Sequence, residues 1–331
     1  MFAEKKFILA PMAEITTPAL RRTVAEFSPG MILFSEMLSA GAVCTRANHN
    51  EPLIMKTEFD ENLIYQIAGN DPDIMAESSL ILQESGCFGI DINMGCSAPD
   101  ILKKKQGAAL LADFNRAREI VSACRKTVRT KLSVKIRAGI EKNDRELMLN
   151  FIKMFADEGV DFVTIHPRWA KISFKRNADW EMISIAKKIS SIPVVGNGDI
   201  VSPIDAIKMM KDTACDAVMI GREAVKSPWI FSLSEKLASR QTSKLEVNIR
   251  NVFIQTLGYI SQYLPERLHK SRGHRFCFYF SKNVKFGHQL FSKIRQLGKI
   301  DEMITEIDEY FNRNRDESLR LITFQSENRT F

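Results

Sequence analysis

The sequence lacks features that would mark a membrane, disulfide-bonded or repeat protein. No stretch approaches the roughly 20 apolar residues of a membrane-spanning helix. The first apolar run, from Phe7, breaks at Pro11, so no basic-then-apolar secretory segment is present. The six cysteines are scattered without a CxxC pair, which suits reduced thiols better than disulfides or a zinc site. We therefore expect a cytoplasmic protein with no membrane segment and no metal.

One segment lacks acidic residues. Between Arg267 and Lys299 there are nine Lys and Arg, three of the five histidines, and no Asp or Glu. The net charge of the whole chain is only +7, and acidic residues return from Asp301, so the asymmetry is local. A field of one sign is a candidate footprint for a phosphate backbone, although a solvated helix face gives the same pattern.

Short apolar runs alternate with longer amphipathic segments over residues 1–225. Eight β-then-α units favour a parallel (β/α)₈ TIM barrel over an open sheet. The predicted strands are Phe7–Ala10, Ile32–Phe34, Leu63–Ile67, Gly89–Ile92, Leu132–Ile136, Phe162–Ile165, Val194–Val195 and Ala217–Ile220.

The alternation stops after Ala224. A polar segment over residues 240–244 is followed by a helical pattern from Asn248, with apolar residues such as Val252, Leu257 and Ile260. At 331 residues the chain can bury a barrel-sized core and still form a smaller unit. We predict a catalytic barrel over residues 1–243 and a small all-helical domain over residues 244–331.

Polar residues follow nearly every predicted strand. Each has a plain explanation by itself, such as a core histidine or a tight-turn glycine. Their convergence on the rim where barrels carry their active sites predicts a functional site there. The residues are Pro11 and Met12, Glu36, Gln66, Asn93 with Cys96, Lys135 and Arg137, His166, Asn197 to Asp199, and Gly221 with Arg222.

The last two strand ends indicate an anion site. Gly198 and Gly221 allow backbone N–H groups to approach a phosphate, which Arg222 can neutralise. The same rim offers the cation of Lys135 together with amide and imidazole groups. This set suits a phosphorylated heteroaromatic cofactor better than a metal, and flavin mononucleotide (FMN) is the natural choice.

Taken together, these motifs resemble the tRNA-dihydrouridine synthase family over nearly the whole chain. The Asn-Met-Gly-Cys segment at residues 93–96 is specific to that family, whereas the strand-end motifs are shared with other FMN barrels. Residues 227–231 resemble its bacterial B branch. Further matching segments are Ala10-Pro11-Met12, Ser35-Glu36-Met37, Gly107-Ala108-Ala109, His166-Pro167-Arg168, Gly196-Asn197-Gly198-Asp199 and Ile220-Gly221-Arg222.

The resemblance implies FMN across the barrel mouth. It implies that Pro11 and Met12 pack against the cofactor and that Gln66, Lys135 and His166 contact its ring or ribityl chain. The phosphate tail is then held by Asn197, Gly198, Asp199, Gly221 and Arg222.

The resemblance also implies the reaction. A flipped uridine of tRNA is positioned by Asn93 and Arg137, receives hydride at C6 from FMN N5, and receives a proton at C5 from Cys96. NADPH or NADH reduces the flavin. Lys103, Arg272 and Arg275 contact the RNA, and we expect a monomer.

Other assignments stay open at this point. Ser97 follows Cys96 where the family usually has Pro, and Trp169 replaces a usual Thr. The same chemistry on ribosomal RNA is an alternative, as is an FMN barrel acting on a free pyrimidine or an enone. A non-catalytic RNA-binding barrel protein is a third.

Overall fold

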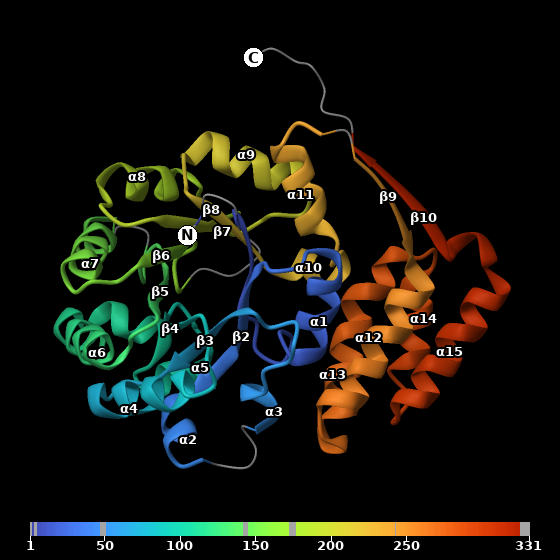
Figure 1. The fold of residues 1–331 in the computed structure, drawn as a ribbon, viewed down its shortest axis with the longest axis horizontal. Coiled ribbons are helices and arrows are strands. Elements are labelled where there is room, and N and C mark those ends of the chain that lie inside the picture. The colour runs from blue at the N-terminus through green and yellow to red at the C-terminus, as the bar shows by residue number, and fades with distance from the viewer. Residues whose placement is uncertain are drawn as a thin grey trace.

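The computed structural model describes residues 2, 5–46, 51–141, 145–171, 177–241 and 243–324. Eight parallel strands form a closed barrel in which each strand pairs with its neighbours in sequence and β1 pairs with β8 (Figure 1). The predicted (β/α)₈ barrel is therefore confirmed. The strands are β1 (Phe7–Leu9), β2 (Ile32–Ser39), β3 (Asn62–Ala68), β4 (Gly89–Met94), β5 (Lys131–Arg137), β6 (Phe162–His166), β7 (Val194–Asn197) and β8 (Ala217–Ile220).

Helices surround the barrel on the outside (Figure 1). Their starts are locally encoded: the Thr17 and Ser202 side chains accept N-cap hydrogen bonds, and each is followed by Pro at the first helical position. The longer helices are α1 (Pro18–Phe27), α4 (Pro72–Gln83), α6 (Phe114–Thr127), α7 (Arg145–Asp157), α8 (Glu181–Ile189), α9 (Pro203–Thr213) and α11 (Ile230–Ala238). The shorter ones are α2 (Ala40–Cys44), α3 (Glu51–Ile54), α5 (Pro99–Lys103), the 3₁₀ helix η2 (Gly107–Ala112) and α10 (Arg222–Lys226).

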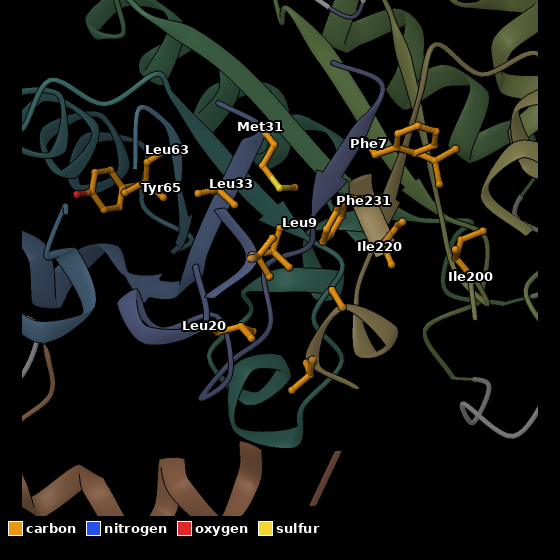
Figure 2. Close-up of a cluster of buried hydrophobic side chains, with 14 of the residues drawn as sticks. Phe7, Leu9, Leu20, Met31, Leu33, Leu63, Tyr65, Ile200, Ile220 and Phe231 are labelled. Carbon is orange, nitrogen blue, oxygen red and sulfur yellow. The ribbon is translucent and has the colours of Figure 1, made fainter. Parts of the chain in front are cut away.

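Two apolar layers hold the barrel together because successive strand residues point to opposite faces. Ile8, Phe34 and Phe162 belong to the cluster that fills the barrel interior. Leu9 and Ile220 belong to the second cluster, which packs the strands against the surrounding helices. Figure 2 shows part of this outer layer, with side chains from the strands lying near Phe231 of α11.

The C-terminal domain packs four longer helices and one short sheet at the side of the barrel (Figure 1). The helices are α12 (Ile249–Tyr263), α13 (Glu266–Phe280), α14 (Gly287–Ile294) and α15 (Ile300–Arg313). An antiparallel pair, β9 (Ser243–Asn248) and β10 (Leu319–Phe324), brackets them. The prediction of an all-helical domain is therefore corrected. The two short strands pair with each other although they lie at opposite ends of the domain's sequence, so no local pattern predicts their pairing.

The two domains share one hydrophobic core. Helix α12 lies along α1 of the barrel, where the hydroxyls of Thr23 and Thr256 hydrogen-bond at 2.9 Å in a buried position. The indole of Trp229 bridges Phe27 and Phe280, with ring centroids at 5.7 and 6.3 Å. The helical domain is thus fixed against the barrel by packing as well as by covalent linkage.

Candidate functional site

Cys96 is held from both sides on the loop that follows β4. Its backbone N–H donates to Oδ1 of Asn93 at 2.9 Å, and its carbonyl accepts from the N–H of Ala108 at 2.8 Å. Gly107 makes the second contact possible: its φ is +61°, and a Cβ there would lie 2.5 Å from the Cys96 carbonyl oxygen. The thiol is half-buried.

A buried polar layer lies beneath this loop. Gln66 donates from Nε2 to Asp91 at 2.7 Å, and Asn93 donates from Nδ2 to Oε1 of Gln66 at 2.8 Å. Asp91 also accepts from the hydroxyl of Ser133 at 2.6 Å. Burial raises the pKa of Asp91 to about 6, while the bonds from Ser133 and Gln66 and the charge of Lys135 oppose the increase. Asp91 is therefore largely ionised at neutral pH.

Lys135 lies beside Asn93 in the register of β4 and β5 and points into the same interior. Burial lowers the pKa of Lys135 to about 8, opposed by Asp91 and assisted by Arg137. Within the described ranges its ammonium makes no hydrogen bond or ion pair, and the neighbouring buried hydroxyl of Thr164 also has no partner. The Lys135 ammonium is thus available to a bound molecule, whereas the Thr164 hydroxyl is enclosed in the interior.

His166 ends β6 and is neutral. Burial, reinforced by the charges of Lys135, Arg137, Arg168 and Arg222, lowers the pKa of His166 to about 2. Arg168 donates from Nη1 to Nε2 of the imidazole at 2.9 Å, so the ring hydrogen resides on Nδ1. Arg168 follows the same strand in the sequence, in the matching segment His166-Pro167-Arg168, but the spacing gives no sign of this contact, so Arg168 is not among the predicted cofactor-binding residues.

The carboxylate of Asp199 interacts with two arginines, Arg168 and Arg222. Its carboxylate accepts two hydrogen bonds from Arg168, at 2.5 and 2.7 Å, and lies 3.7 Å from Arg222. It also accepts from the N–H of Ala178 at 2.6 Å. Asp199 thus fixes the guanidinium of Arg168 and lies near that of Arg222, and its contact with the cofactor tail stays a prediction.

The glycines predicted at the phosphate end stand close to other site residues. Gly198 has φ +120°, and a Cβ there would lie 3.0 Å from the His166 ring. A Cβ on Gly221 would lie 3.5 Å from the sulfur of Met12, so these two loops adjoin. Asn197 donates to the Met219 carbonyl at 2.8 Å, which ties the ends of β7 and β8 together.

Asn93 and Arg137, the two residues expected to position a uridine, both hydrogen-bond the Cys96 loop. Nε of Arg137 donates to the Gly95 carbonyl at 2.7 Å. Oδ1 of Asn93 accepts from both Gly95 and Cys96, as its Nδ2 donates to Gln66. Lys103 lies exposed on α5, away from this packed layer.

Arg272 and Arg275 join the two domains. Arg275 forms an ion pair with Glu14, which lies on the loop after β1. Arg272 has only 10% of its side chain exposed and lies 3.4 Å from Glu14 and 3.8 Å from Glu36. Arg272 is thus an interface residue, in contrast to the free RNA contact expected from the sequence, because its charge is turned toward the barrel carboxylates.

The exposed side of α13 carries the remaining basic groups. Arg267, Lys270 and Phe278 are exposed at helical spacing, and Lys282 follows them with its ammonium 4.5 Å from the Phe278 ring centroid. This exposed face adjoins Arg275, whose partner Glu14 lies at the barrel mouth. The exposed basic residues of the helical domain therefore lie on a face next to the loop that follows β1.

Two features are absent from the described part of the chain. There, no group of three or more His, Cys, Asp or Glu side chains is placed to hold a metal ion. None of the helices in those ranges has the length and apolar character that crossing a bilayer requires.

Comparison with known proteins gives a consistent result. Residues 8–311 match the family described as Dihydrouridine synthase (Dus). The chain is 34% identical to tRNA-dihydrouridine synthase B of Pasteurella multocida (strain Pm70) over 264 residues, covering 78% of this chain and 79% of that protein. It is 32% identical to tRNA-dihydrouridine synthase B of Vibrio vulnificus (strain CMCP6), with the same two shares.

Among solved structures, 2-naphthoyl-CoA reductase in complex with 2-naphthoyl-CoA is similar, with a TM-score of 0.54 and 13% identity. The match covers 71% of this chain and 50% of that chain, and it supports the barrel fold alone. The family match spans the barrel and most of the helical domain, and the relatives exceed 30% identity over most of their length. The chain belongs to the dihydrouridine synthase family.

Proposed function

We propose that this protein reduces the C5–C6 double bond of particular uridines in tRNA, giving 5,6-dihydrouridine. FMN held at the barrel mouth would supply the hydride for uracil C6, and NADPH or NADH would reduce it. Cys96 donates the proton to C5. The observation that carries the proposal is Cys96, half-buried and held through its backbone amide and carbonyl, at a barrel mouth that also holds the partly buried Lys135.

The residues at the mouth fit FMN. The ammonium of Lys135, which has no hydrogen-bond or ion-pair partner in the described part of the chain, suits the polar edge of an isoalloxazine ring. Arg168 and Arg222 gather around Asp199 next to Gly198 in the loop after β7, and this pair of guanidinium groups suits a phosphate. The neutral imidazole of His166 adds no charge to this end.

Each polar residue then has a task that its geometry supports. Lys135 stabilises negative charge on the bound ring, and Arg222 meets the phosphate with 57% of its side chain exposed. Gln66 and Asn197 shape the floor beneath the cofactor, and Pro11 with Met12 covers its edge. Cys96 faces the substrate side, where its thiol acts as the general acid.

RNA docks, in this proposal, on the exposed face of α13. Arg267, Lys270 and Lys282 supply phosphate contacts, and Arg275 joins this basic face to the loop that follows β1. Extruding the target base costs a few kcal/mol, which these contacts offset. A small-molecule reductase has no need of such a surface, which favours an RNA substrate over a free pyrimidine or an enone.

The test uses purified protein, NADPH and unmodified substrates. Visible flavin absorbance, followed by mass-spectrometric detection of dihydrouridine in tRNA transcripts, is the expected result. Ribosomal RNA, uridine and a cyclic enone serve as parallel substrates. A colourless protein that reduces none of them would overturn the proposal, and turnover of the enone alone would replace tRNA as the substrate.

A further inference from the structure

The polar layer below Cys96 is a hydrogen-bond chain with a single direction. Ionised Asp91 only accepts, so Nε2 of Gln66 must face it and Oε1 must face Asn93. Nδ2 of Asn93 then faces Gln66, at 2.8 Å, and its Oδ1 is left for the backbone of the Cys96 loop.

The same direction follows from the other end. The N–H groups of Gly95 and Cys96 both point at one atom of the Asn93 amide, at 3.1 and 2.9 Å, and that atom must be oxygen. Neither amide group can be turned over, because exchanging its nitrogen and oxygen would place two donors or two acceptors against each other. Asp91, Gln66 and Asn93 are all buried, so water cannot replace a lost partner at low cost.

From this geometry we infer that Asp91 and Gln66 are positioning residues. They fix the orientation of the Asn93 amide and so hold the Cys96 backbone, with its thiol, at the barrel mouth. The link with proton donation rests on the proposed function, whereas the link with the position of Cys96 does not. The sequence-based assignment gives Asp91 no role, and Ser133, its second donor, lies beside it in the register of β4 and β5.

The test exchanges charges without changing shape. In Gln66→Glu, a second carboxylate faces Asp91 where the native amide donates, so the chain is broken while Asn93 and Cys96 stay unaltered. When Gln66→Glu is combined with Asp91→Asn, the new amide at position 91 donates to the new carboxylate at position 66 and still accepts from Ser133. That carboxylate also accepts from Asn93. The double variant has the native charge and restores a complete chain.

The readout is the rate at which iodoacetamide labels Cys96 in the purified protein at pH 8, followed by peptide mass spectrometry. We expect labelling to rise about tenfold in Gln66→Glu and to return to within about twofold of wild type in the double variant. Cys124 and Cys277 are fully buried and report global unfolding in the same digest.

Three outcomes overturn the inference: an unchanged Cys96 rate in the single variant, failure of Asp91→Asn to restore it, or equal increases at Cys124 and Cys277. Uridine reduction measured on the same samples separates the two proposals. If labelling responds as expected while even the wild type forms no dihydrouridine, the positioning chain stands and the proposed function fails.

Discussion

At the scale of single residues, Cys96 owes its place to contacts made by its backbone. Asn93 holds its N–H and Ala108 holds its carbonyl, so the loop is restrained without using the thiol. Ser97, where the family usually has Pro, therefore removes only one of several restraints on the loop.

Cys96→Ala tests the proton donor directly. General acid catalysis contributes roughly 10²–10⁴-fold, so uridine reduction is expected to fall at least about 100-fold. Flavin content and the rate of flavin reduction by NADPH are expected to stay normal, since the alanine removes no group assigned to the cofactor. Cys44→Ala, on a half-exposed cysteine of α2, is the matched control. Wild-type turnover by Cys96→Ala would remove the residue from this role.

Gly107→Ala tests the support behind the thiol. The φ of +61° and the 2.5 Å approach to the Cys96 carbonyl oxygen leave no room for a methyl group. We expect a loss of about 1–3 kcal/mol in the free energy of unfolding, measured by urea denaturation, together with reduced activity. Gly258→Ala is the control, because no described residue beyond its own helical turn lies within 4 Å of the added Cβ on α12. Equal effects of both substitutions would contradict the assignment.

His166 gives the protein a pH-dependent stability. Its folded pKa of about 2 lies below the ordinary value of 6.5, so the unfolded chain takes up a proton that the folded site refuses. The ionisation of His166 therefore does not lower the free energy of unfolding above pH 6.5. Below pH 6.5 that free energy decreases as the pH decreases, because the unfolded chain binds the proton. The expected slope reaches about 1.4 kcal/mol per pH unit. Urea denaturation of wild type and His166→Asn between about pH 4.5 and 7.5 measures it, and parallel curves would rule this contribution out.

At the scale of elements, α13 has two faces with different tasks. One face turns Arg272 into the barrel carboxylates, where Nε of Arg272 and Oε1 of Glu36 are buried without hydrogen-bond partners among the described residues. Burial raises the pKa of Glu36, opposed mainly by the charge of Arg272. The other face is exposed and basic. The basic segment between Arg267 and Lys299 thus supplies residues both to the interface with the barrel and to the proposed docking surface.

Substitutions on the two faces should separate stability from RNA binding. Lys270→Glu with Lys282→Glu should weaken tRNA affinity and flatten its salt dependence while leaving the unfolding free energy within about 0.5 kcal/mol. Arg272→Glu should instead destabilise the protein by about 3 kcal/mol, since it leaves the buried carboxyl group of Glu36 without its cation. Filter binding across a salt series and urea denaturation give the two readouts. Unchanged tRNA affinity in the lysine variant would exclude this face as the docking surface.

At the scale of the whole molecule, the barrel and the helical domain are one packed body. The α1–α12 contact, the buried Thr23–Thr256 pair and the Trp229 bridge place the basic face at a fixed position relative to the mouth. A rigid junction lets RNA bound on one domain present a base to the other without reordering the protein.

Trp229→Ala tests whether the barrel and the helical domain unfold together. Removing the indole opens a cavity on both sides of the junction and should cost about 3–5 kcal/mol. We expect one calorimetric transition in both proteins, with a lower melting temperature in the variant. Phe114→Ala, on a helix remote from the junction, is the comparison. Two separate transitions in the wild type would show that the domains unfold independently.

The sequence alone determined the architecture and the chemistry available at the mouth. Eight apolar runs alternating with amphipathic segments predicted the barrel, because burial on both faces of a parallel sheet imposes that pattern. The polar residues after those runs, Cys96 among them, fall at one rim because the strands are parallel.

Tertiary structure decided what each polar side chain touches. Arg275 pairs with a carboxylate 261 residues away, β9 pairs with a strand at the far end of its domain, and Asn93 faces its own loop. Local periodicity encodes which face of an element is buried. Partner choice depends on distances and hydrogen-bond directions between elements, which exist only once the chain has folded.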